Sequence, residues 1–108
     1  MQEVSIEEFR KIDFKVGKVV EAERVPKSEK LLKLMIDIGG DTKQCVASLA
    51  DPYTLTDIKD RLVIVVTNLR NRKIFGLDSE VMLLAAVDGP DVSLLHPGKP
   101  FSPGSKVM

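Results

Sequence analysis

The sequence predicts an all-β fold, a small barrel of about five strands, on three observations. Apolar and polar residues alternate over 14–22 and 31–38, as in strands with one buried face. The runs 62–67 and 81–87 are apolar and rich in β-branched residues, which is typical of central strands. Gly17 interrupts the first strand, where a bulge or bend lets a sheet turn a corner.

The chain is expected to begin with a short helix. Ser5 and Glu8 fit a capping box, with Ser5 as the N-cap and Glu8 reaching back to it. The helix then ends near Lys11 and places Ile6 and Phe9 on one face. Because so short a helix is not stable alone, it must dock on another surface.

Turn signals set the order of the remaining elements. Gly39-Gly40-Asp41 predicts a hairpin between the strand 31–38 and a return strand over 42–48. Residues 51–60 lack strand alternation and predict a turn with one or two helical turns. A helical insert between the third and fourth strands of a five-stranded barrel is the layout of the OB fold. A small open sandwich is the competing architecture, and an extended tail follows residue 89 in either case.

Length and composition narrow the class of protein. At 108 residues, the chain 1–108 is expected to form one domain, and its formal net charge of zero provides no whole-molecule attraction to nucleic acid. No apolar run approaches the ~20 residues of a membrane span and no signal peptide opens the chain, so a cytoplasmic protein is expected.

Catalysis and metal binding find little support. One cysteine and one histidine exclude a structural zinc site, which needs four such ligands, and no cofactor is expected. Cys45 belongs to an alternating strand and is expected to be buried or half-buried there, and His96 stands in a turn beside Pro97. Apart from a chance meeting of these two side chains, no nucleophile and base can be paired, and no phosphate-binding glycine motif is present. The sequence therefore predicts a protein that is not an enzyme.

Positive charge is concentrated just after the fourth strand. Arg70, Arg72 and Lys73 stand together, with no acidic residue from 68 to 77. The following strand opens with a hydroxyl and a thioether, Ser79 and Met82. A rigid strand that delivers such a loop favours a polyanion with exposed bases or sugars. The alternative is a solvated turn that happens to carry charge.

Several motifs in order resemble one family. They are Asp13-Phe14-Lys15-Val16-Gly17-Lys18-Val19, Ser28-Glu29-Lys30-Leu31, Asn68-Leu69-Arg70 through Phe75-Gly76, and Ser79-Glu80-Val81-Met82-Leu83-Leu84-Ala85-Ala86. Together they resemble the tRNA-binding OB domain, found as stand-alone proteins and at the C-terminus or β subunit of methionyl-tRNA synthetases.

The resemblance implies a homodimer that binds tRNA by its folded shape, with a synthetase subunit as a further partner. It implies RNA contacts from nine residues: Lys27, Ser28, Lys30, Asn68, Arg70, Arg72, Lys73, Ser79 and Met82. Arginine can grip phosphate with its fork and stack on a base, whereas lysine supplies a point charge. Amide and hydroxyl groups suit the 2′-hydroxyls by which RNA differs from DNA.

A related branch remains open. Many tRNA-binding members have glycine where this chain has Val81, and Ser79-Glu80-Val81 with the patterns at 91–95 and 101–105 resembles the CsaA secretion chaperones. Such a chaperone binds unfolded export proteins, here in an apolar cleft between subunits. The helix that carries Ile6 and Phe9 and the extended tail with Leu94, Leu95 and Phe101 are the apolar segments left for a dimer interface.

Overall fold

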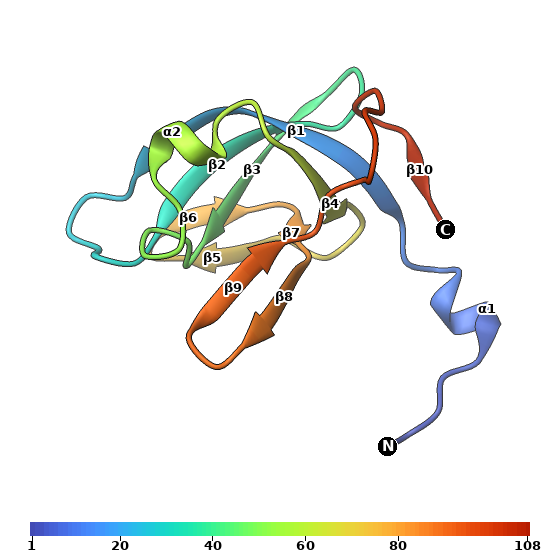
Figure 1. The fold of residues 1–108 in the computed structure, drawn as a ribbon. Helices are drawn as coiled ribbons and strands as arrows, with labels where there is room; N and C mark the ends of the chain where they lie inside the picture. Colours follow the sequence, from blue (N-terminus) through green and yellow to red (C-terminus); the bar gives the residue numbers. More distant parts are fainter.

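In the computed structural model, which describes all residues 1–108, one antiparallel sheet curls into a barrel (Figure 1). The sheet has the strand order β3-β2-β1-β4-β7, and β10 pairs with the start of β1. The strands are β1 (Phe14–Arg24), β2 (Leu32–Asp37), β3 (Thr42–Ala47), β4 (Leu62–Val66), β7 (Met82–Leu83) and β10 (Lys106–Val107). The helical insert α2 (Leu55–Ile58) lies between β3 and β4, and the OB-type barrel is confirmed.

The first strand bends at a different residue from the one predicted. Gly17 pairs regularly with Val63, whereas the register with β2 shifts between Val19 and Glu21, so the bulge lies beyond the glycine. Gly17 serves close packing instead, because a Cβ there would lie 2.6 Å from the Cγ2 of Ile36 on β2. The bulge itself cannot be seen in the sequence because the bulged residue is an ordinary valine.

The N-terminal helix α1 (Ile6–Phe9) is shorter than predicted. Its N-cap is Ser5, as expected, and the Ser5 Oγ accepts a hydrogen bond from the Glu8 backbone N–H at 3.1 Å. The Glu8 carboxylate reaches back only to the Ser5 hydroxyl. Phe9 contacts Phe14 at the start of β1, with ring centroids 5.6 Å apart, but the helix buries none of its residues and its apolar face stays largely exposed.

The region after β4 differs most from the prediction. The segment expected to be a loop contains β5 (Arg72–Ile74) and β6 (Leu77–Ser79), which pair as a two-stranded hairpin. The strand expected over 81–87 divides at Leu84, whose backbone N–H donates to the Ile64 carbonyl at 3.0 Å. Beyond it, β8 (Ala85–Asp88) and β9 (Asp91–Leu94) form a separate ribbon that projects beneath the barrel (Figure 1).

The interior of the barrel is filled by aliphatic side chains. The core cluster comprises Val19, Leu32, Leu34, Ile36, Ile38, Cys45, Leu49, Ile58, Val63, Val65, Val81 and Leu94. Cys45 is therefore buried as predicted, and burial raises the pKa of its thiol above the usual range despite a hydrogen bond from Ser79 and the charge of Arg72.

The C-terminal tail crosses the predicted Gly39-Gly40 turn so closely that a Cβ on Gly104 would lie 2.9 Å from the Gly39 Cα. None of the helices has the length and apolar character needed to cross a membrane.

Candidate nucleic-acid interface

Two of the three positive residues that follow β4, Arg72 and Lys73, are carried by a hairpin, whereas Arg70 lies in the loop that leads into it. We call β5, β6 and their turn the cationic hairpin, residues 72–79. Its register pairs Arg72 with Ser79 and Lys73 with Asp78, and the turn residues are Phe75 and Gly76. Pairing of the two strands fixes the direction of the side chains, so the hairpin presents its cations in a defined arrangement.

The base of the cationic hairpin is fastened to β3. The Val46 backbone N–H donates to the Ser79 Oγ at 3.1 Å, and the Gln44 side chain donates to the Asp78 carbonyl at 2.9 Å. Gln44 and Glu80 are joined twice, by Gln44 N–H to Glu80 Oε1 and by Glu80 N–H to the Gln44 carbonyl, both at 2.8 Å. These bonds join the last part of the barrel to β3 and hold the hairpin against it.

Ser79 is consequently not placed where the sequence suggested. Only 1% of its surface is exposed, and its hydroxyl faces Val46 and Cys45 in the interior. A direct bond from this side chain to RNA is therefore not available in this conformation. Val81 is buried as well, so its side chain neither obstructs an approaching RNA backbone nor lines a peptide-binding cleft.

The arginines of this region are free to bind an external anion. The four ion pairs of the chain are formed by lysines, so the guanidinium groups of Arg70 and Arg72 have no carboxylate partner. Lys73 differs, because its Nζ lies 2.8 Å from the Asp78 Oδ1 across the hairpin. Both members of that pair are largely exposed, so the attraction between them is screened by water.

Asn68 connects the start of this region to the N-terminal segment. Its Oδ1 accepts from the Asp13 backbone N–H at 2.9 Å, and its Nδ2 donates to the Lys11 carbonyl at 2.6 Å. The neighbouring Thr67 hydroxyl also bonds to the Asp13 carboxylate. The amide of Asn68 is thus engaged within the chain, where it fixes the chain between α1 and β1.

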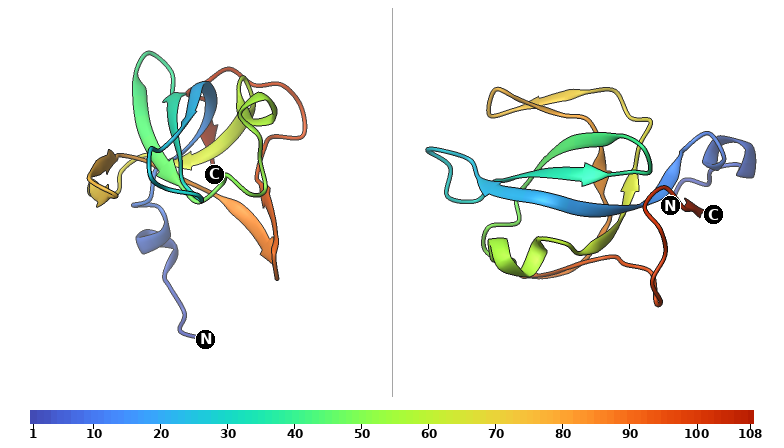
Figure 2. Two further views of the ribbon diagram at one scale, coloured as in Figure 1. Left: turned by 90° about the vertical axis from the view of Figure 1, so that its left-hand side faces the viewer. Right: turned by 90° about the horizontal axis from the view of Figure 1, so that it is seen from above.

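The other predicted residues stay at the surface. Lys27 and Lys30 are exposed in the loop between β1 and β2, residues 25–31, and the Ser28 Oγ accepts from the backbone N–H groups of Lys30 and Leu31. Figure 1 and the right-hand view of Figure 2 show this loop and the tip of the cationic hairpin at the same end of the barrel. Met82 is 38% exposed on β7, apart from that end.

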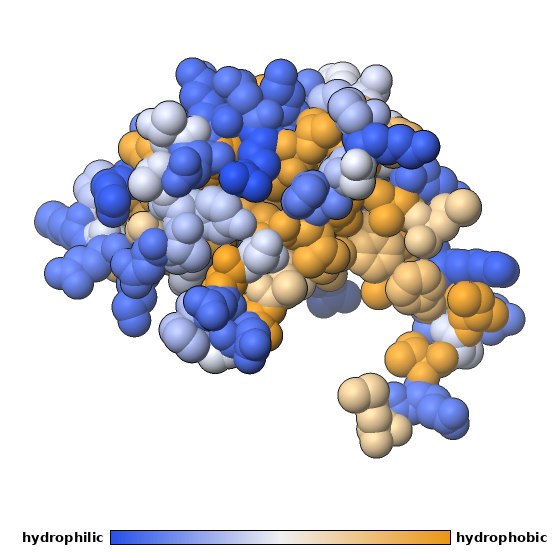
Figure 3. Space-filling model, in the orientation of Figure 1, coloured by the Kyte–Doolittle hydropathy of each residue, from blue (hydrophilic) through white to orange (hydrophobic).

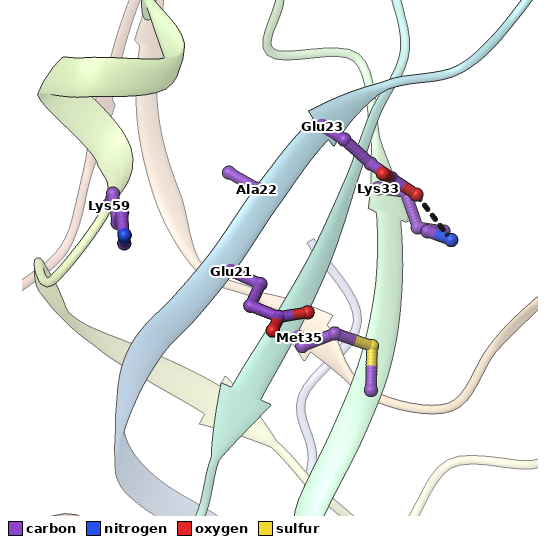
Figure 4. Close-up of a pocket in the computed structure, with 6 residues that line it drawn as sticks. All are labelled: Glu21, Ala22, Glu23, Lys33, Met35 and Lys59. Atoms are coloured by element: carbon purple, nitrogen blue, oxygen red, sulfur yellow. Dashed lines mark ion pairs between the residues drawn. The ribbon is translucent and has the colours of Figure 1, made fainter.

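Two recesses lie away from the cationic hairpin. One, of about 390 Å³, covers the outer face of β1 and β2 and contains Glu21 and Glu23, with Lys33 paired to Glu23 at 2.5 Å (Figure 4). Its two carboxylates are balanced by Lys33 and Lys59, so the recess has no excess of positive charge to attract a polyanion. The other, of about 370 Å³, lies between α1 and β10 and is lined mainly by Ile6, Phe9, Ile12, Phe14, Val107 and Met108.

No group of three or more His, Cys, Asp or Glu side chains is arranged to hold a metal ion.

Fold and surface together define a small OB-type barrel that carries a cationic hairpin, with two nearby arginines that have no carboxylate partner. Barrels of this class typically bind nucleic acids. The family described as "Putative tRNA binding domain" matches residues 14–106, and this chain belongs to that family. Methionine–tRNA ligase of Methanoregula boonei is 51% identical over 104 residues, which are 96% of this chain and 15% of that enzyme. The chain thus spans about 15% of the length of that curated relative.

Solved structures agree with this assignment. The methionyl-tRNA synthetase related protein of Pyrococcus horikoshii superposes with a TM-score of 0.93 at 30% identity, and each chain is covered completely. The chaperone CsaA of Bacillus anthracis superposes with a TM-score of 0.89 at 29% identity, covering 99% of this chain and 100% of its own. Both resemblances noted in the sequence are confirmed, and the tRNA-binding family is the one supported by sequence and structure alike.

Proposed function

We propose that this chain is a non-catalytic module that binds tRNA by its folded shape, in the cytoplasm, as a homodimer. The methionine–tRNA ligases that resemble it make a methionyl-tRNA synthetase the natural partner, either as a separate subunit or as the remainder of a longer chain. The observation that carries the proposal is the pair of unpaired guanidinium groups, Arg70 and Arg72, on a region anchored to the barrel.

The charge distribution supports a local contact rather than a general attraction. Net charge is zero, so binding must come from the cations gathered at one place. Arg70, Arg72 and Lys73 supply the main contact, and Lys27 and Lys30 extend the surface at the tip of the hairpin. Ser28, whose oxygen already accepts from backbone N–H groups, can still donate its hydroxyl hydrogen. Asn68 and Ser79 act by holding this surface in position.

The apolar surface at the N-terminus supports a dimer. Ile6 is 53% and Phe9 43% exposed, and Figure 3 shows apolar side chains along this segment and the adjoining underside of the barrel. A four-residue helix with no buried residue needs a partner surface, and a second copy provides an identical one. Doubling the cationic hairpin gives a surface broad enough for the corner of a folded tRNA, which one hairpin is not.

Fluorescence anisotropy with total tRNA, repeated over a range of salt concentrations, tests the RNA-binding proposal. Arg70→Ala with Arg72→Ala should weaken binding and reduce the slope of log K against log [salt] by about one unit for each phosphate that is no longer neutralised. The matched control is Lys59→Ala with Lys99→Ala, which removes the same charge from exposed positions elsewhere. Equal slopes for both double variants would place the RNA site away from the hairpin.

The chaperone alternative is tested in the same experiment. An apolar peptide competitor should remain bound at high salt, whereas tRNA held by phosphate contacts should be released. A protein that holds an unfolded peptide through about 1 M salt and shows no binding of tRNA at low salt would favour the chaperone. The dimer is tested separately by sedimentation equilibrium of the full chain.

A further inference from the structure

The turn of the cationic hairpin carries an aromatic residue, Phe75, that lies outside the core of the barrel. Phe75 is 58% exposed at the tip of the hairpin. The aromatic pair of this chain lies elsewhere, between Phe9 and Phe14 with ring centroids 5.6 Å apart. Phe75 belongs neither to the core cluster nor to the apolar side chains packed against it, so the stability of the barrel does not explain its presence.

The backbone at this position is also unfavourable for phenylalanine. Phe75 has φ +56° and Gly76 has φ +80°, and Ile74 pairs with Leu77 across them. Positive φ at both central residues is the pattern of a two-residue type I′ turn, in which Asn, Asp and Gly are preferred. A bulky side chain in the left-handed region is strained, so an ordinary hairpin would be more stable with asparagine here.

We infer that Phe75 stacks on an unpaired nucleobase of the bound RNA. This inference rests on the proposed tRNA-binding function and names the contact made by the tip of the hairpin. A nucleobase fits better than an apolar protein surface, because Phe75 follows the exposed cations Arg72 and Lys73 on the same hairpin and lines neither of the recesses described above. Those cations lie on the strand that leads into the turn, so phosphates held there bring the adjoining bases to the ring.

The first test separates the effect of the ring on RNA binding from its effect on the stability of the hairpin. Phe75→Asn removes the ring and installs the residue that the turn prefers, so the hairpin should be at least as stable as before. We expect about tenfold weaker binding of tRNA with an unchanged salt slope, because stacking releases no counterion. Phe75→Tyr keeps the ring and should bind like the parent protein. Parent affinity in Phe75→Asn would overturn the inference.

The second test reports stacking directly. The chain contains no tryptophan, so Phe75→Trp introduces a single indole at the tip. Its fluorescence should be quenched by total tRNA and by a hairpin RNA with an unpaired loop, and not by a blunt RNA duplex at equal occupancy. Equal quenching by the duplex, or none by any bound RNA, would overturn the inference. Failure of the parent protein to bind tRNA at low salt would instead overturn the proposed function.

Discussion

The buried hydroxyl of Ser79 provides a test of whether this residue supports the barrel or contacts RNA. Ser79→Ala removes the acceptor that lies 3.1 Å from the Val46 backbone N–H. Both residues are buried, so no water replaces the missing oxygen. Leaving a buried donor unpaired costs about 1–3 kcal/mol. Because a domain of this size is stable by about 5–15 kcal/mol, the variant should still fold.

Urea unfolding followed by far-UV circular dichroism measures that destabilisation. The midpoint should fall while the m value is unchanged, and Tm should drop by about 4–8 °C for each kcal/mol. Ser93→Ala is the matched control, because Ser93 is exposed on β9 and its side chain makes no hydrogen bond in the structure. Its unfolding midpoint should equal that of the parent protein within error.

RNA binding by the same variant decides between the two roles. At about 25 °C the folded Ser79→Ala protein should bind tRNA within about twofold of the parent, because the deleted hydroxyl faces the interior. Parent-like stability together with a tenfold loss of affinity would refute the structural role. It would show that the hydroxyl turns outward to meet RNA and that the bond to Val46 contributes nothing.

Two further predictions concern the hairpin charge and the crossing of the C-terminal tail. Asp78→Asn removes the carboxylate that pairs with Lys73, so the ammonium group becomes free to pair with a phosphate. Binding of tRNA, measured by fluorescence anisotropy, should tighten by about two- to fivefold at low salt. Weaker binding would contradict the placement of Lys73 at the RNA surface. Gly104→Ala should lower the free energy of unfolding by about 2–5 kcal/mol, measured by urea unfolding. Gly104 has φ +92°, and the new Cβ would lie 2.9 Å from the Gly39 Cα. A variant as stable as the parent protein would contradict the close crossing of the tail over the turn.

Local features of the fold could be predicted from the sequence. Ser5 as a helix cap, Gly39 and Gly40 as a hairpin turn with positive φ, and Cys45 as a buried strand residue depend on neighbours a few positions away. The order of barrel strands with a helical insert also followed from periodicity. The bulge in β1 did not, because it occurs at Val20, a residue typical of a regular strand.

The roles of individual site residues depended on partners far along the chain. Asn68 bonds to Asp13, which is 55 positions away, and Ser79 bonds to Val46 across 33 positions. A polar residue beside a cationic segment has the same local appearance whether it faces solvent or the interior. The family resemblance implies RNA contacts for both residues, and the long-range hydrogen bonds that occupy their side chains cannot be seen in the sequence. One local signal was present for the hairpin itself, because Gly76 is a preferred residue at the second position of a two-residue turn.

The residues that carry the family resemblance thus fall into two physical groups. One group, which includes Asn68, Ser79 and Glu80, forms hydrogen bonds that fix the hairpin and the N-terminal segment to the barrel. The other, which includes Arg70 and Phe75, projects into solvent without a partner. Variants of the first group should change affinity only as far as they change stability, whereas variants of the second should change affinity alone. Measuring both quantities for each variant therefore separates the residues that hold the surface from those that touch the ligand.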